Sequence, residues 1–381
     1  MIVRITSLDT MTFRYRSRIV PDVDGHIHPG PEHDAFQSVT RIRTDEGAEG
    51  YCFGGSPSMV ELGRQMLIGQ EPFDRERIYE RLWQSHRINK QALSDRNIAA
   101  LDIALWDLLG RMTGLPVCKL LGRYRDRVKA YASTMCGDDM PGGLDSPQAY
   151  ADFADQCREQ GYHAFKLHTW MPPYGSDVKR DAAACRAVRE AVGTDMHLMV
   201  DCHHHYTREE ALYLGRVLEE LGFHWMEEPL NEYNIASYVW LANKLDIPLV
   251  GPESIEGRMY TRVEWILRGA TDVNRYDAEW HGGITAAMKM VHLCESLGVR
   301  LEIHGQHEAN LQVLGAMSIP GEYYERGLLH PTLDYEAETP WLAEKHDPLD
   351  RDGYVLISQK PGMGIEIDWD FIEKNTVKPW G

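Results

Sequence analysis

From about residue 128 onward, short apolar runs alternate with amphipathic segments, and this alternation limits the possible folds more than any other feature of the chain. The runs are VKAYAS, AFKLH, HLMVD, HWMEE, IPLVGPE, DVNRYD, RLEIH and EYYE. The segments between them carry helix signals. Thr207 and Glu210 form a capping box before a helix that ends at Gly222, and Ser146-Pro147 begins another. Strict alternation of this kind predicts a parallel sheet, and eight units favour a closed barrel over an open sheet.

The chain on either side of this region has a different pattern. Residues 1–127 contain extended segments followed by helical ones, which predicts an α+β unit. Within it, residues 21–34 (PDVDGHIHPGPEHD) are rich in Gly, Pro and His, and this composition predicts a mobile loop that acts as a lid. The barrel is expected over residues 128–345, and residues 346–381 are expected to pack back on the N-terminal unit.

Composition excludes several classes of partner. Lys and Arg total 40 against 58 Asp and Glu, which gives a formal net charge of −18 with no basic run, so neither nucleic acid nor a membrane surface is expected as a partner. The 7 cysteines are scattered without a C-x-x-C pair, which fits a reducing cytoplasm better than a disulfide framework or a thiolate zinc site. No stretch approaches the roughly 18 apolar residues of a membrane span, and we expect a cytoplasmic protein.

Three acidic residues, Asp201, Glu227 and Glu253, each follow an apolar run and lie 26 residues apart twice over. That interval matches one strand, one helix and two loops, so the three carboxylates are expected at the ends of successive parallel strands. Active sites of such barrels lie at the carboxyl ends of the strands. Three converging carboxylate oxygens predict a site for a hard divalent cation, Mg²⁺.

Lys166 and His168 are two residues apart on the second strand, so both side chains should point into the barrel while Leu167 packs outward. An unpaired buried ammonium is costly, which indicates a functional role for Lys166, and near a metal its pKa is expected to fall toward that of a usable base. The same spacing relates Asp201 to His203. We therefore expect His203 to face the site, with the next two histidines at its rim or solvated.

Further candidates end the last three strands. Asp277 ends the sixth and His304 the seventh, and a carboxylate beside an imidazole is the usual arrangement for a histidine acting as general base. Glu325, at the end of the eighth strand, would complete the ring opposite Lys166 and could hydrogen-bond a developing oxyanion if it is protonated.

A competing motif lies in the loop. Asp24-Gly-His26-Ile-His28 mimics the H-x-H pair that binds zinc in amidohydrolase barrels, but it precedes the first barrel strand by about 100 residues. A substrate-contacting role in the lid is the better interpretation of His26 and His28.

The chain resembles the mandelate racemase type of the enolase superfamily. Residues 100–122 (ALDIALWDLLGRMTGLPVCKLLG) are similar to the segment that joins the family's capping domain to its barrel, MVDCH, WMEEPL and GPES to its metal strands, and YDAEWHGGIT and EIHGQ to its Asp/His dyad. PGMGIEID is similar to its C-terminal return to the capping domain. The resemblance implies a (β/α)7β barrel, Mg²⁺ held by Asp201, Glu227 and Glu253, abstraction of the proton α to a carboxylate, and a homo-oligomer.

Two departures from the family pattern narrow the reaction. Lys166-Leu-His168 replaces Lys-x-Lys, and this leaves open whether Lys166 or His168 faces the substrate as base or acid. Asp201-Cys-His203 replaces Asp-x-Asn, and this is similar to sugar-acid dehydratases of the superfamily in which a histidine at that position expels the β-hydroxyl. We therefore expect a sugar-acid dehydratase with His304 as the α-proton base and His203 or His168 as the acid that expels the 3-hydroxyl. A racemase or epimerase using Lys166 and His304 is the nearest alternative, followed by a zinc hydrolase and a non-catalytic binding protein.

Overall fold

A computed structural model describes residues 3–23, 25–171, 174–319 and 321–381. Eight parallel strands form a sheet that curls into a barrel, in the order β10-β9-β8-β7-β6-β5-β4-β11. Strands β10 and β11 contact each other and complete the ring, although no ladder joins them among the described residues. The strands are β4 (Arg127–Thr134), β5 (Ala164–His168), β6 (His197–Asp201), β7 (Trp225–Glu227), β8 (Leu249–Val250), β9 (Val273–Tyr276), β10 (Arg300–Ile303) and β11 (Tyr323–Leu329).

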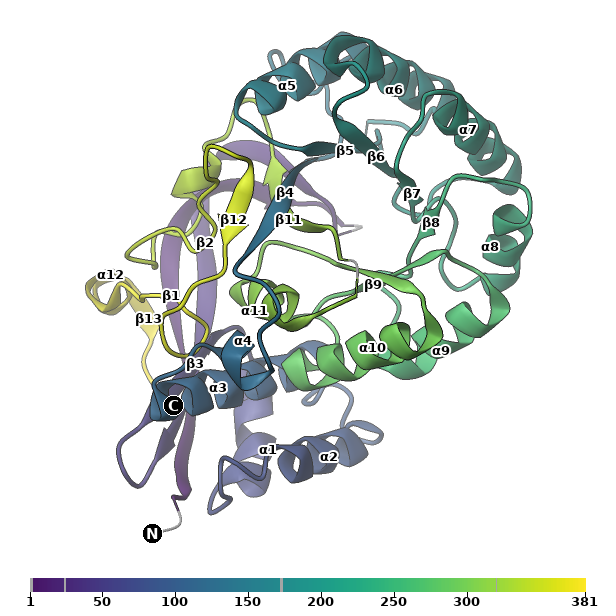
Figure 1. Ribbon diagram of the computed structural model, residues 1–381. Helices are drawn as coiled ribbons and strands as arrows, with labels where there is room; N and C mark the ends of the chain where they lie inside the picture. The colour runs from purple at the N-terminus through teal and green to yellow at the C-terminus, as the bar shows by residue number, and fades with distance from the viewer. Residues whose placement is uncertain (1–2, 24, 172–173, 320) are drawn as a thin grey trace.

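A helix connects each strand to the next, so all eight predicted strands and the (β/α)7β order are confirmed. The helices are α5 (Pro147–Glu159), α6 (Val178–Val192), α7 (Arg208–Glu220), α8 (Ile235–Ala242), α9 (Arg258–Arg268), α10 (Gly283–Leu297) and α11 (Glu308–Ala316). Figure 1 looks into the barrel, with α5 to α10 outside the strands. The capping box of Thr207 and Glu210 opens α7 as predicted, and the Ser146 side chain caps α5.

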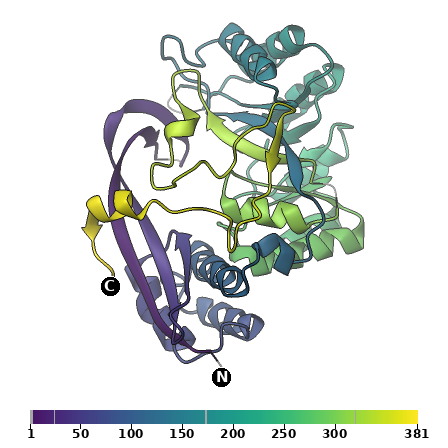
Figure 2. The same ribbon diagram turned by 60° about the vertical axis from the view of Figure 1, so that its left-hand side comes forward.

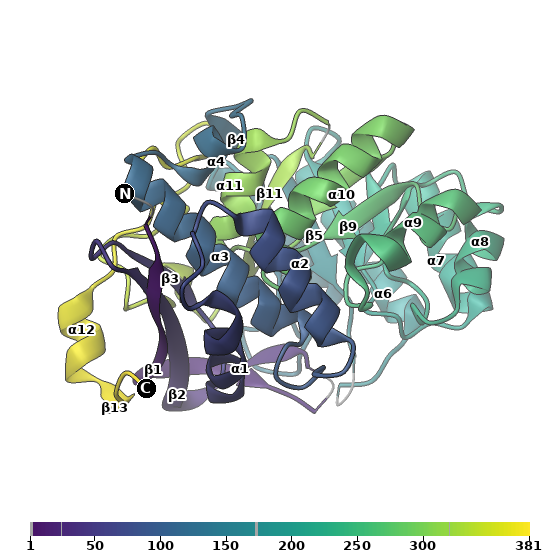
Figure 3. The same ribbon diagram turned by 90° about the horizontal axis from the view of Figure 1, so that it is seen from below.

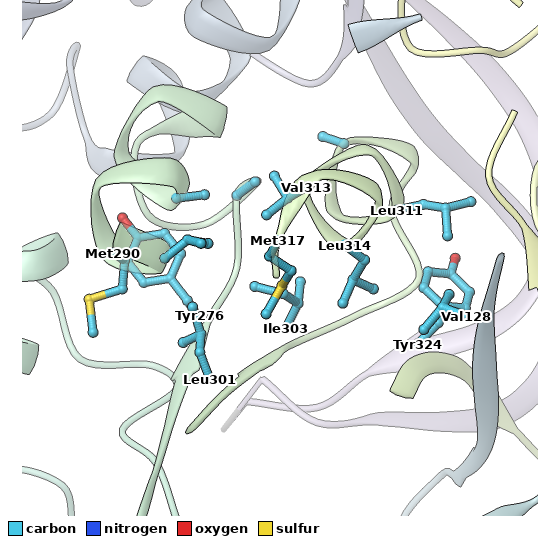
Figure 4. Close-up of a cluster of buried hydrophobic side chains, with 14 of the residues drawn as sticks. Val128, Tyr276, Met290, Leu301, Ile303, Leu311, Val313, Leu314, Met317 and Tyr324 are labelled. Carbon is cyan, nitrogen blue, oxygen red and sulfur yellow. The ribbon is translucent and has the colours of Figure 1, made fainter. Parts of the chain in front are cut away.

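Apolar side chains fill both sides of the barrel wall. Inside it, seven buried side chains form a plug: Tyr131, Ala164, Met199, Trp225, Val250, Val273 and Tyr323. Outside it, residues such as Leu301, Ile303 and Leu314 pack between β10 and α11, as Figure 4 shows. Burying one such side chain stabilises the fold by about 1.5–3 kcal/mol. The filled interior leaves only the mouth at the strand ends free for polar chemistry.

The N-terminal unit is an antiparallel sheet with helices on one side (Figure 3). The sheet has the order β13-β1-β2-β3. Helix α3 is buried along most of its length because it lies between β3 and barrel helix α10. The elements are β1 (Ile5–Pro21), β2 (Ile27–Thr44), β3 (Glu49–Phe53), α1 (Pro57–Leu67), α2 (Arg75–His86), α3 (Asp95–Thr113), α4 (Val117–Leu120) and, from the other end of the chain, β13 (Thr376–Lys378).

The predicted loop over residues 21–34 is wrong for most of its length. Strand β2 begins at Ile27, and His28 and Pro29 pair with Val20 and Ile19 of β1. Asp24 lies outside the described residues. Here β1 and β2 form a two-stranded ribbon, and prolines are tolerated where a ladder does not require their missing N–H. The hairpin is therefore a stiff arm that arches beside the barrel (Figure 2).

The C-terminal segment joins the two units. Strand β12 (Tyr354–Leu356) pairs with β4 of the barrel, α12 (Trp369–Lys374) follows, and β13 pairs with β1. A single turn of 3₁₀ helix, η1 (Tyr335–Ala337), lies in the connection after β11. Among the described residues, no helix combines the length and apolar character needed to cross a membrane.

Candidate active site

A cavity of about 700 Å³ lies between the carboxyl ends of the barrel strands and the β1–β2 hairpin. Seven of the residues predicted for the site line it: His26, His168, His203, Glu253, Asp277, His304 and Glu325. The other four, Asp201, Glu227, Lys166 and His28, are buried behind this lining. The strand ends thus gather the predicted residues at one mouth.

Asp201 and Glu227 end β6 and β7, and Glu253 follows β8. One carboxylate oxygen from each lies within 4.8 Å of the other two, and all three residues are buried. Glu228 adopts a left-handed backbone conformation, and its side chain accepts a hydrogen bond from the backbone N–H of Glu253 at 2.6 Å. Glu228 therefore helps to position Glu253, and Glu227 is the acid of this pair that belongs to the carboxylate cluster.

Lys166 lies beneath the carboxylates and is fully buried. Its Nζ is 3.2 Å from Asp201, 3.0 Å from Glu227 and 3.0 Å from Glu325. Burial opposes the charge, but Glu227 and Glu325 outweigh it and raise the pKa of Lys166 well above its ordinary value. The surrounding carboxylates thus stabilise the ammonium form, and the expectation that this pKa falls beside a bound metal stays a prediction.

Arg275, which the sequence analysis did not single out, is a second buried cation in the site. Its Nε lies 2.7 Å from Glu227, and its terminal nitrogens reach Glu325 at 2.7 Å and the Tyr131 hydroxyl at 3.0 Å. Strand alternation puts Arg275 on the same face of β9 as Asp277, two residues later, and this periodicity was the available signal.

The charge balance of the cluster fits a divalent cation. Four buried carboxylates, from Asp201, Glu227, Glu253 and Glu325, face two buried cations, Lys166 and Arg275, so acidic groups outnumber basic ones. Burial, opposed by His304 and Arg275, raises the pKa of Glu253 to about 8. Oxygen-only ligands and this charge are what Mg²⁺ prefers, so the residues fit that ion.

His304 and Asp277 form the predicted dyad. His304 Nδ1 lies 2.7 Å from Asp277, whose other oxygen accepts a hydrogen bond from Asn310 at 3.0 Å. The Nε2 atom lies 3.2 Å from Glu253. Burial would lower the pKa of His304, but Glu253 and Asp277 outweigh it and raise this pKa to about 9. Cation binding at Glu253 would remove its contribution, and the ring would then lose its proton more readily.

Glu325 is held as an anion. It accepts hydrogen bonds from Ser133 Oγ at 2.7 Å and from the backbone N–H of Gly305 at 2.8 Å, in addition to its two cation contacts. Burial is outweighed by Lys166 and Arg275, so the pKa of Glu325 lies well below its ordinary value. A protonated Glu325 that donates to an oxyanion is therefore not what this arrangement supports.

His168 and His203 meet beside Asp201, with ring centroids 4.8 Å apart. His168 lies on β5 with Nε2 at 3.3 Å from Asp201. His203 is in a turn after β6, where a left-handed backbone brings its ring back toward Asp201, so its position depends on the turn and not on strand alternation. Burial lowers the pKa of His203 well below its ordinary value. His204, predicted to be at the rim or solvated, instead contacts Glu228 and Glu232.

The hairpin contributes one predicted histidine to the cavity wall. The His26 ring packs edge-on against His203 with centroids 4.8 Å apart, and its Nδ1 lies 3.2 Å from Asp22. His28 also binds Asp22, at 3.0 Å, and packs against Tyr174 behind the lining. Among the described residues, none of the clusters able to hold a metal includes His26 or His28, so the zinc hydrolase alternative has no support.

Comparisons with known proteins agree with this geometry. Residues 31–122 match the mandelate racemase / muconate lactonizing enzyme N-terminal domain, and residues 149–371 match the family described as enolase C-terminal domain-like. The chain is 30% identical to the L-talarate/galactarate dehydratase of Salmonella typhimurium over 86% of this chain and 80% of that protein. It is 32% identical to the D-galactarolactone cycloisomerase of Agrobacterium fabrum over 87% and 89%, respectively.

A solved structure is more similar still. The crystal structure of D-glucarate dehydratase from Agrobacterium tumefaciens, complexed with magnesium, superposes with a TM-score of 0.96. The two sequences are 46% identical, and the match covers 99% of this chain and 100% of the other.

Proposed function

This chain belongs to the enolase superfamily, in the mandelate racemase and muconate lactonizing enzyme subgroup, and from that premise we propose that it dehydrates an acid sugar to a 2-keto-3-deoxy acid with Mg²⁺ as cofactor. The observation that carries the proposal is the convergence of three carboxylates with the His304–Asp277 dyad at one cavity. The dehydratases of galactarate and glucarate among its relatives support the same reaction class.

Asp201, Glu227 and Glu253 would hold the ion. When bound, the ion supplies positive charge beside the substrate carboxylate and favours the negative charge that develops there. His304 Nε2 accepts the proton from C2 of the acid sugar, and Asp277 fixes Nδ1–H and stabilises the imidazolium that results. Arg275 and Lys166 hold the Glu227 carboxylate in place.

The second half of the reaction breaks the bond between C3 and its hydroxyl oxygen. His203 or His168 delivers a proton to that oxygen as the electron pair from C2 forms the double bond, and water leaves. The resulting enol takes up a proton at C3 and becomes the 2-keto-3-deoxy acid. Both imidazoles line the cavity beside Asp201. In the sequence they come before Glu227 and Glu253, whereas the dyad residues come after them.

Racemisation is less well supported. It requires a second base, and Lys166 is the residue that would supply it. The Lys166 ammonium is bound to three carboxylates and is not among the residues that line the cavity. Lys166 is therefore less well placed than the His304–Asp277 dyad to exchange a proton with a substrate in the cavity.

Turnover of a panel of acid sugars, followed by detection of 2-keto-3-deoxy product, tests the proposal. We expect product with Mg²⁺ and its loss after chelation, restored by added Mg²⁺. The variant His304→Asn should lower kcat by roughly 10²- to 10⁴-fold while substrate still binds. Unchanged turnover in this variant, or deuterium incorporation from D₂O without keto acid, would refute the proposed reaction.

Two broader features are also part of the proposal. We place the enzyme in the cytoplasm, because all seven cysteines are free and buried and so suit a reducing compartment. We also expect a homo-oligomer, as the family resemblance implied. Size-exclusion chromatography with light scattering measures the second directly.

A further inference from the structure

One wall of the cavity lies away from the metal ligands and is built by the connection that follows β11. It contributes Tyr335, Glu338, Thr339, Trp341 and Lys345, with His346 at its end. Lys345 is the only lysine or arginine among the described residues that line the cavity. The cavity is otherwise lined by carboxylates such as Glu279, Glu308 and Glu338. Lys345 is therefore a candidate to bind a negatively charged group of the ligand.

The Lys345 ammonium forms no close ion pair among the described residues, and Asp347, Glu336 and Glu338 attract it only from a longer distance. Its Nζ donates to the backbone oxygen of Tyr335 at 2.8 Å and lies 3.9 Å from the centre of the Tyr335 ring. No Asp or Glu oxygen in the described part of the chain lies within 4.0 Å of it. Burial lowers the pKa of Lys345 from its ordinary value. The negative group of a bound ligand would therefore stabilise the Lys345 ammonium more than the protein alone does.

The wall that carries Lys345 is rigidly held. Asp347, which is 0% exposed, accepts hydrogen bonds from the hydroxyl of Tyr324 on β11 at 3.0 Å and from that of Tyr335 at 2.7 Å. These bonds tie both ends of the segment between Tyr335 and Asp347 to the barrel. Lys345 lies two residues before this anchor, so its ammonium is positioned before any ligand binds, which reduces the entropy cost of binding.

His346 connects this wall to the catalytic end of the cavity. Its Nε2 lies 2.8 Å from the backbone oxygen of Gln306, two residues after His304. A carbonyl oxygen only accepts, so the hydrogen of this bond is on Nε2. Nδ1 is buried without a hydrogen-bond partner among the described residues.

We propose that Lys345 binds the distal carboxylate of a dicarboxylic sugar acid, an aldarate. The inference rests on the proposed function and deepens it by naming the substrate class. The first carboxylate belongs at the metal cluster, and a second one without a cation would face the acidic wall. An aldonate, which ends in a neutral hydroxyl, gains nothing from Lys345.

Steady-state kinetics with D-glucarate and D-gluconate, which differ in the oxidation state of C6, test the inference. We expect the wild-type enzyme to prefer glucarate, and Lys345→Met to lower kcat/KM for glucarate by roughly 10- to 100-fold, mainly through KM, as expected for loss of a charged hydrogen bond. Values for gluconate should not change, and Lys345→Arg should restore part of the loss. The matched control is Lys360→Met, because Lys360 is 44% exposed and paired with Glu344 and Glu366.

Equilibrium binding separates this inference from the proposed reaction. In the His304→Asn variant with Mg²⁺, calorimetry should show tighter binding of glucarate than of gluconate, and adding Lys345→Met should remove the difference. That result without turnover of any acid sugar by the wild type would leave the Lys345 site standing and overturn the dehydratase. Turnover with equal preference for the two acids, or an equal loss for both in Lys345→Met, would overturn the Lys345 site and leave the dehydratase standing.

Discussion

Two buried cations hold the carboxylates at the base of the site. Lys166 and Arg275 are both fully buried, and each contacts more than one carboxylate of the cluster. An isolated ammonium or guanidinium at this depth would be strongly destabilising, but an excess of negative charge reverses the balance. Glu253 and Asp277 raise the pKa of His304, and burial is the largest cause of the raised pKa of Glu253. The carboxylates at this mouth therefore suit a divalent ion held by Asp201, Glu227 and Glu253.

Two measurements distinguish the roles of His168 and His203, the histidines beside Asp201: exchange of the C2 hydrogen with D₂O, and elimination of water to form the keto acid. We expect His203→Asn to lose keto-acid formation by roughly 10²- to 10⁴-fold while the C2 hydrogen still exchanges with D₂O. The reason is that His203 Nε2 is buried without a hydrogen-bond partner among the described residues and its ring lies in the cavity wall against His26. Nuclear magnetic resonance of recovered substrate measures the exchange.

His168→Asn is the comparison for that experiment. His168 Nε2 lies 3.3 Å from the metal-ligand candidate Asp201, so this variant should lower exchange and elimination together. The reverse pattern, with exchange kept in His168→Asn and lost in His203→Asn, would assign the proton donor to His168.

At the scale of the element, the β1–β2 hairpin takes the place of the flexible lid that the sequence predicted, and it brings His26 to the cavity wall. Its strands pair as far as Pro21 and Ile27, and Asp22 gathers the tip. Asp22 accepts from the backbone N–H of His26 at 3.0 Å and contacts both the His26 and His28 rings. Because the His26 ring packs on His203, the contacts that hold His26 also help to position the His203 ring.

Asp22→Asn should therefore weaken substrate binding without unfolding the hairpin. The substitution removes the charge that orients both imidazoles, and we expect kcat/KM to fall by about 10-fold, which corresponds to loss of one charged hydrogen bond. Melting temperature should change little. The matched control is Asp34→Asn on the same hairpin, where the carboxylate is 40% exposed and pairs with Arg14 and Arg16. Equal kinetic effects of the two substitutions would contradict a specific role for Asp22.

At the scale of the whole molecule, helix α3 holds the two units together. Asp102 of α3 accepts hydrogen bonds from the backbone N–H of Thr285 at 2.9 Å and from its hydroxyl at 2.5 Å, at the start of barrel helix α10. A side chain at Gly283 would collide with Asp102, so glycine permits this close approach. Burial raises the pKa of Asp102 from 3.8 to about 6 even though Thr285 opposes the shift.

This shift predicts a pH-dependent contribution to stability. Between about pH 4 and 6 the folded state binds more protons at Asp102 than the unfolded state does, so the free energy of unfolding falls as pH rises. A shift of about 2 pKa units corresponds to about 3 kcal/mol, fully present below the unfolded pKa and lost above the folded one. Asp102→Asn should lack this pH-dependent loss because an amide does not titrate, and its oxygen can still accept a hydrogen bond from the backbone N–H of Thr285.

Chemical unfolding of wild type and variant at pH 4 and pH 7 measures the difference. We expect the stability of the wild type relative to Asp102→Asn to decline by about 2–3 kcal/mol between the two values. The control is Asp126→Asn, because that side chain is 72% exposed. Parallel pH dependence in wild type and Asp102→Asn would mean that Asp102 stays ionised in the folded protein.

The part of this protein that could be predicted from sequence is the part set by local pattern. Apolar runs and caps placed all eight barrel strands, and strand ends placed Asp201, Glu227, Glu253, Asp277 and His304, because strand alternation and the common orientation of parallel strands act within each repeat. The loop predicted from composition over residues 27–34 is wrong, because this segment, although rich in proline and glycine, pairs with β1 and forms part of β2.

Tertiary structure alone decided the charges and the neighbours. The Lys166 ammonium is held among three carboxylates, Glu325 is an anion, and Lys345 reaches the cavity from a segment that follows the last barrel strand. Each outcome depends on groups far apart in the chain, such as Lys166 with Glu325 or Arg275 with Tyr131. Electrostatic energy depends on distance through space and on burial, and neither quantity is encoded by the residues adjacent in sequence.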